Sequence, residues 1–72
     1  MEERILQIMK DVFGVDDIDR TVSQQNCAKW DSMAQLNLIV ELETEFDVSF
    51  EPEEIGEMVS FDVVCKMVEK KL

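Results

Sequence analysis

The pair Asp31-Ser32 is the best candidate for chemistry in this chain, because it opens an apolar-periodic segment inside a concentration of negative charge. From Asp31 to Asp62 there are ten carboxylates and no Lys or Arg, whereas the rest of the chain balances seven acids with seven bases. The ten are Asp31, Glu41, Glu43, Glu45, Asp47, Glu51, Glu53, Glu54, Glu57 and Asp62. The segment supplies the formal net charge of −10. It predicts a docking surface for basic partners with the serine at its focus.

Ser32 lacks the neighbours that a catalytic nucleophile needs. The chain contains no His, and no spacing pairs Ser32 with a Lys or with a carboxylate of raised pKa. We therefore do not expect an enzyme, and if Ser32 reacts, another protein must activate it. A structural alternative stays open, since Asp or Ser before an apolar run commonly caps a helix.

Apolar periodicity predicts four helices, one long loop and no strand, which together make a small all-α bundle. The expected helices are Glu3–Phe13, Ser32–Phe46, Pro52–Glu57 and Phe61–Lys71. Gly14 is a natural C-terminal stop, Pro52 suits a first helical position, and Ser60 suits an N-cap. The long loop spans residues 15–30 and lies between the first two helices.

The helix expected at 32–46 is predicted to have one buried face and one face free to meet a partner. The predicted buried face comprises Met33, Leu36, Leu38, Ile39, Val40, Leu42 and Phe46. The predicted free face comprises Ala34, Asn37, Glu41, Thr44 and Glu45.

Length and composition indicate a single domain, residues 1–72, with 46% hydrophobic residues, two Gly and one Pro. An acidic chain repels phosphate backbones and anionic lipids, so we expect neither nucleic acid nor membrane as a partner. The sequence contains no candidate secretory signal or transmembrane helix, and we expect a cytoplasmic protein.

Cys27 and Cys65 are expected to be reduced thiols, and with no His they are too few for a zinc site.

The run Trp30-Asp31-Ser32-Met33, with the helix end Leu42-Glu43-Thr44-Glu45-Phe46, resembles the acyl carrier protein family. The family signature is Asp-Ser-Leu opening an acidic helix that ends Leu-Glu-x-Glu-Phe. The resemblance covers nearly the whole chain in length, acidity, helix order, the long first loop and the turn at Glu51–Glu54.

The resemblance implies a carrier whose Ser32 Oγ is joined to 4′-phosphopantetheine, taken from coenzyme A by a separate phosphopantetheinyl transferase. Asp31 is implied to contact that transferase. The arm would carry an acyl or aminoacyl group as a thioester and present it to partner enzymes. Expected partners are a loading enzyme and a downstream synthase or transferase with basic surfaces, and the expected chain is a stand-alone monomer. The alternative is an unmodified, carrier-like interaction module in which Ser32 serves only as a helix cap.

Two sets of residues follow from the resemblance. The docking set is Met33, Asn37, Glu41, Glu45, Asp47, Glu53 and Glu54. The acyl-pocket set is Leu36, Leu42, Phe50, Ile55 and Met58. Because Phe50 and Ile55 are bulky, we expect a shallow pocket suited to short cargo.

Some positions depart from typical fatty-acid carriers, which have an acid two residues after the serine and a Glu five residues after it. Ala34 and Asn37 stand there instead, Met33 replaces the usual Leu, and Trp30 precedes the Asp. The loss of two charges changes partner choice more than fold. These departures indicate a specialised or aminoacyl pathway rather than housekeeping fatty-acid synthesis.

Overall fold

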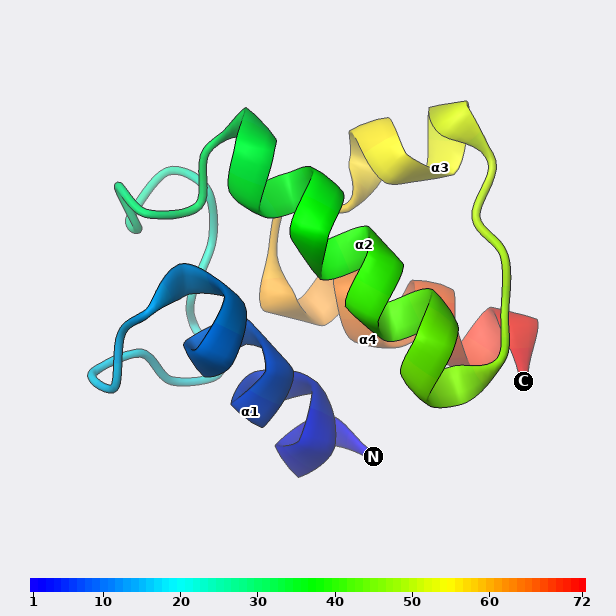
Figure 1. Ribbon diagram of the computed structural model, residues 1–72, viewed down its shortest axis with the longest axis horizontal. Helices are drawn as coiled ribbons and strands as arrows, with labels where there is room; N and C mark the ends of the chain where they lie inside the picture. The colour runs from blue at the N-terminus through cyan, green and yellow to red at the C-terminus, as the bar shows by residue number, and fades with distance from the viewer.

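The computed structural model describes residues 1–72 as four α-helices joined by loops (Figure 1). The helices are α1 Glu2–Phe13, α2 Ser32–Phe46, α3 Pro52–Glu57 and α4 Phe61–Lys71. α1 packs against α2 and α4, and the short α3 lies on the far side of α2 from α1 (Figure 1). The all-α, four-helix prediction is confirmed, and only the start of α1 differs, by one residue. None of the four helices combines the length and apolarity that a bilayer crossing requires.

The helix ends are set by residues whose local chemistry stops or starts a helix. Gly14 adopts the left-handed region at φ 68° and donates its N–H to the Lys10 carbonyl at 2.9 Å, which ends α1. The Ser60 hydroxyl accepts the Val63 N–H at 3.3 Å and begins α4. The C-cap of α2 is Asp47, a non-glycine residue whose backbone adopts the left-handed region at φ 55°.

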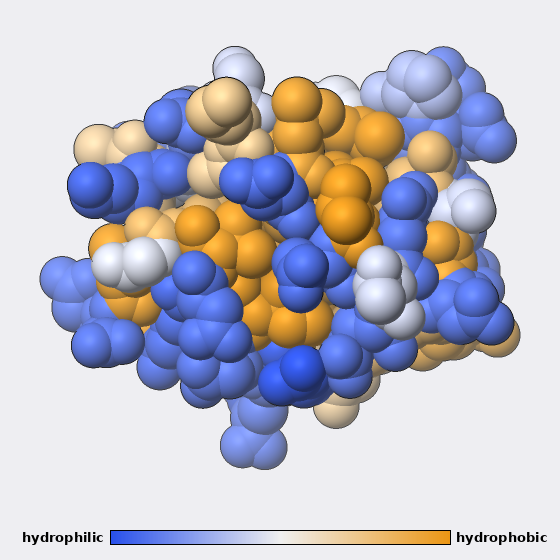
Figure 2. All heavy atoms as spheres, viewed as in Figure 1, coloured by the Kyte–Doolittle hydropathy of each residue, from blue (hydrophilic) through white to orange (hydrophobic).

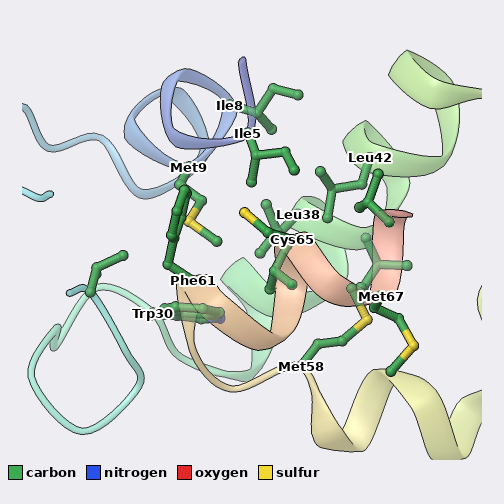
Figure 3. Close-up of a cluster of buried hydrophobic side chains, with 14 of the residues drawn as sticks. Ile5, Ile8, Met9, Trp30, Leu38, Leu42, Met58, Phe61, Cys65 and Met67 are labelled. Atoms are coloured by element: carbon green, nitrogen blue, oxygen red, sulfur yellow. The ribbon is translucent and has the colours of Figure 1, made fainter. Parts of the chain in front are cut away.

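The hydrophobic core is one cluster drawn mainly from α1, α2, α4 and the segment before α4 (Figure 3). Its largest fully buried side chains are Phe61, Ile5, Met9, Leu38, Leu42, Met58, Val64 and Val68. Both cysteines are free and buried, Cys65 within α4 and Cys27 in the long loop.

The long loop between α1 and α2 is tied to the rest of the fold. The Gln24 N–H donates to the Val59 carbonyl at 2.9 Å, and the Phe61 N–H donates to the Val22 carbonyl at 3.0 Å. These two bonds flank an isolated antiparallel bridge between Ser23 and Ser60. The loop is therefore held against the start of α4, and its last residues reach α2 in a fixed position.

The predicted faces of α2 were partly wrong. Met33, Leu36 and Val40 lie on the outer face, exposed by 74%, 63% and 58%, and Ala34 is buried. The buried residues of α2 are Ala34, Gln35, Leu38, Ile39 and Leu42. These follow the i, i+3, i+4 spacing of one stripe. Because apolar residues occur on all sides of α2, their positions alone did not identify which stripe is buried.

Candidate functional site

Ser32 is the first residue of α2, and it is exposed. The preceding Asp31 is extended, at φ −97° and ψ −172°, and its carboxylate accepts the Ala34 N–H at 2.9 Å. Asp31 is therefore the N-cap, and capping does not engage the Ser32 hydroxyl. This geometry resolves which of the two residues caps the helix, and it leaves Ser32 Oγ accessible for chemistry.

Ser32 opens onto a surface groove of about 620 Å³ beside α3. The groove is lined by Gln24, Trp30, Asp31, Ser32, Gln35, Leu36, Ile55, Gly56 and Val59. Asp31 is the only ionisable side chain in this lining, and its carboxylate already serves as the helix cap. The groove therefore offers Ser32 no general base apart from this capping carboxylate, so we expect reaction of the hydroxyl to depend on groups brought by another protein.

Beneath the groove, Trp30 and Gln35 form a buried polar connection. Trp30 Nε1 donates to Gln35 Oε1 at 2.6 Å, while Gln35 Nε2 donates to the carbonyls of Ile55 and Met58, both at 3.1 Å. The Trp30 ring also packs on Phe13, with centroids 5.0 Å apart. This network joins the start of α2 to α3 and to the segment before α4. Sequence analysis did not single out Gln35, and the available signal was an amide on the same helical stripe as Leu38.

The predicted docking residues differ in how free they are. Met33, Asn37, Glu41, Asp47 and Glu53 are exposed. Glu45 is also exposed, but its carboxylate pairs with Arg4 at 2.9 Å, and the hydrogen bond from that guanidinium lowers the pKa of Glu45.

Glu54 is mainly engaged inside the chain. Its side chain is only 14% exposed and contacts Lys71 Nζ at 2.8 Å and Lys70 Nζ at 3.7 Å. It also accepts the Glu51 N–H at 2.8 Å. That backbone hydrogen bond, and then the one from Lys71, hold the pKa of Glu54 below its usual value. Glu54 thus fastens α3 to the end of α4.

The predicted acyl-pocket residues fall into two groups. Leu36 and Ile55 line the groove next to Ser32. Leu42, Phe50 and Met58 belong to the hydrophobic core and do not line that groove. The structure therefore brings two of the five together beside the serine.

The outer face of α2 presents an apolar strip that sequence analysis had placed inside the fold. We call Met33, Leu36 and Val40 the α2 strip, since they recur at helical spacing along the exposed face. Figure 2 shows hydrophobic side chains reaching the surface among hydrophilic ones on the side of the molecule where α2 faces the viewer. Scattered apolar residues are common on surfaces, but an aligned strip on the same helix as the exposed Ser32 favours a contact surface.

Comparison with known proteins shows a likeness to a solved structure. No protein-family model matches the chain, and no curated protein matches it significantly. The chain is similar to the solution structure of a holo acyl carrier protein from Geobacter metallireducens, with a TM-score of 0.86 and 29% sequence identity. The match covers 97% of this chain and 83% of that one.

Proposed function

The structural match supports assigning this chain to the acyl carrier protein family, and on that premise we propose that it carries acyl or aminoacyl groups through Ser32. Carriers of this family are not enzymes, which agrees with a groove that offers Ser32 no free base. The observation that carries the proposal is the exposed Ser32 at the start of α2, left free because Asp31 is the cap.

The residues around Ser32 fit 4′-phosphopantetheine. The Asp31 carboxylate accepts the Ala34 N–H. The two preceding N–H groups, those of Ser32 and Met33, can then face a phosphate attached to Ser32 Oγ. The 15-residue α2 directs the positive end of its dipole to the same point. When bound, the group supplies a terminal thiol that holds cargo as a thioester. The role of the chain is to expose the hydroxyl, fix its position at a rigid helix end and provide a groove beside it.

Asp31 has a second proposed role at this position. Its cap fixes the backbone that carries Ser32, and its carboxylate lies at the surface where the phosphopantetheinyl transferase must approach. The transferase supplies the base and takes the phosphopantetheine from coenzyme A, because no free base faces Ser32 in the groove.

Partner enzymes are proposed to meet the outer face of α2. The α2 strip supplies apolar contact, while Asn37 and Glu41 lie beside it and Glu53 lies on α3. A fitting partner has an apolar centre that covers the strip and Lys or Arg residues at its edge. Glu45 and Glu54 contribute less free charge, since bases of the chain already pair with both.

The experiment that tests the proposal is intact-mass measurement of the purified apo chain, incubated with coenzyme A and a broad-specificity phosphopantetheinyl transferase. We expect a gain of one phosphopantetheine on the wild type and none on Ser32→Ala. Because Asp31 is the cap, Ser32→Ala should remain folded, which circular dichroism checks. A folded wild type without a mass gain would contradict the carrier function and favour an unmodified interaction module.

A further inference from the structure

Trp30 and Gln35 line the groove at Ser32 and are both buried, and Trp30 belongs to the hydrophobic core. We propose that this hydrogen-bonded pair closes the core to cargo, so that a group attached through Ser32 stays in the surface groove over Gln35. The inference rests on the proposed carrier function, and it makes Gln35 a residue that selects cargo by size. Short cargo fits within the groove, whereas a long alkyl chain extends beyond it along the surface.

The first argument is the completeness of the hydrogen bonds. Gln35 is the one polar residue among the 19 buried residues. Its oxygen accepts from Trp30 Nε1, and its nitrogen donates to the carbonyls of Ile55 and Met58. A chain that entered between α2 and α3 at this point would break these bonds. It would offer the carbonyls and the indole no replacement, because an alkyl group neither donates nor accepts.

The second argument is the packing on either side of the pair. Trp30 is 3% exposed and its ring packs against Phe13 on α1, so the indole is held from behind. On the inner side, Leu38 and Met58 are fully buried and Phe61 is 2% exposed. Figure 3 shows these labelled side chains from different elements gathered in one cluster. Side chains packed this closely must move before cargo can enter.

The third argument is the character of the groove itself. Leu36, Ile55 and Val59 supply apolar wall, and the exposed Gln24 adds an amide to the lining. A short acyl or aminoacyl group can contact this lining without entering the core. The deeper apolar residues of the core lie behind Gln35, so a longer chain could reach them only by displacing its hydrogen bonds.

The test compares the chain loaded through Ser32 with butyryl and with octanoyl groups, using amide chemical shifts in 15N-labelled protein. For the wild type we expect both groups to shift amides of the groove residues Leu36, Ile55 and Val59. We expect the amides of Leu38 and Met58 to stay in place with either group. In Gln35→Ala, the octanoyl group should shift Leu38 and Met58 as well, and the melting temperature should rise on octanoylation, as it does not in the wild type.

Two variants keep the test decisive. Trp30→Phe preserves an aromatic ring against Phe13 but removes the Nε1 donor. It should also admit the octanoyl group, so it tests the inference even if Gln35→Ala does not fold. Asn26→Ala is the matched control. Its amide also holds the fold, by accepting the Ser23 N–H and donating to the Thr21 carbonyl, both at 2.9 Å. Its loss should leave the octanoyl shifts confined to the groove.

The outcomes separate this inference from the function on which it rests. Wild-type protein that gains the arm by mass, but whose Leu38 and Met58 amides shift with octanoyl cargo, would overturn the closed-core inference alone. Protein that gains no mass would overturn both. Shifts confined to the groove in the wild type and spreading inward in the Gln35 or Trp30 variant would establish the inference.

Discussion

Asp31 is proposed to have two roles, and substitutions can separate them. Asp31→Ala removes the oxygen that accepts the Ala34 N–H at 2.9 Å. Loss of a helix N-cap costs about 1 kcal/mol, and a destabilisation of that size lowers the melting temperature of a domain this small by roughly 4–8 °C. Asp31→Asn keeps an acceptor that caps about as well as Asp, so its melting temperature should stay near that of the wild type. Differential scanning calorimetry of the three apo proteins measures both values.

The second role is measured by the rate of phosphopantetheine transfer at saturating coenzyme A. A charge-assisted hydrogen bond contributes about 1.5–3 kcal/mol, so losing one to the transferase lowers kcat/KM roughly ten- to hundredfold. We expect this loss in Asp31→Asn, although its fold is intact. Ser60→Ala is the matched control. It removes the cap of α4, the 3.3 Å hydrogen bond that the Ser60 hydroxyl accepts from the Val63 N–H, without changing Asp31 or Ser32, and this variant should be modified at the wild-type rate.

Two results would refute this reasoning about Asp31. Asp31→Asn modified as fast as the wild type would mean that the carboxylate acts only as a cap. An unchanged melting temperature in Asp31→Ala would mean that the hydrogen bond to Ala34 does not stabilise α2.

Three further predictions concern charge, thiol reactivity and docking. The Glu51 N–H and Lys71 lower the pKa of Glu54 from 4.5. The stability that ionised Glu54 adds to the fold is therefore complete above that value and is lost as pH falls through the folded pKa. Glu54→Gln should therefore flatten the fall of melting temperature as the pH drops below 4.5, and a curve parallel to the wild type would contradict this. Burial raises the pKa of Cys65 to about 11, so a disulfide reagent should modify it in native buffer only as the chain unfolds; rapid native reaction would argue against that burial. Val40→Ser, on the exposed face of α2, should raise the KM of the transferase without lowering the melting temperature, and an unchanged KM would exclude the α2 strip from that interface.

Each of these predictions has a control in the same chain. Glu53→Gln removes an exposed carboxylate beside Glu54 and should leave the fall of melting temperature at low pH unchanged. Cys27→Ser leaves Cys65 as the only cysteine, so that its reaction can be followed alone. Lys66→Ala alters an exposed residue of α4 and should not change the KM.

The helices could be predicted from the sequence because their ends carry residues with strong local preferences. Gly14 permits the left-handed turn that ends α1, Pro52 opens α3, and Ser60 caps α4. Asp31 and Ser32 could be placed at the start of α2 for the same reason, but the sequence did not decide which of them caps. That depended on the extended backbone of Asp31.

The orientation of α2 and the floor of the groove could not be predicted. Apolar residues surround α2, so periodicity alone did not reveal that Ala34 faces inward while Val40 faces out. The role of Gln35 depends on carbonyls 20 and 23 residues away. The pairing of Glu45 with Arg4, 41 residues apart, likewise depends on how α1 packs against α2. Local propensity carries no information about such distant partners.

The central claim is that Ser32 itself carries the phosphopantetheine, and the position of the modification tests it most directly. Trypsin cleavage after Lys29 and glutamyl endopeptidase cleavage after Glu41 release the peptide 30–41, in which Ser32 is the only hydroxyl-bearing residue. Tandem mass spectrometry of the modified wild type should find one phosphopantetheine on this peptide and none on peptides containing Ser23, Ser49 or Ser60. An unmodified 30–41 peptide from protein that has gained the group elsewhere, or has not gained it at all, would contradict the account.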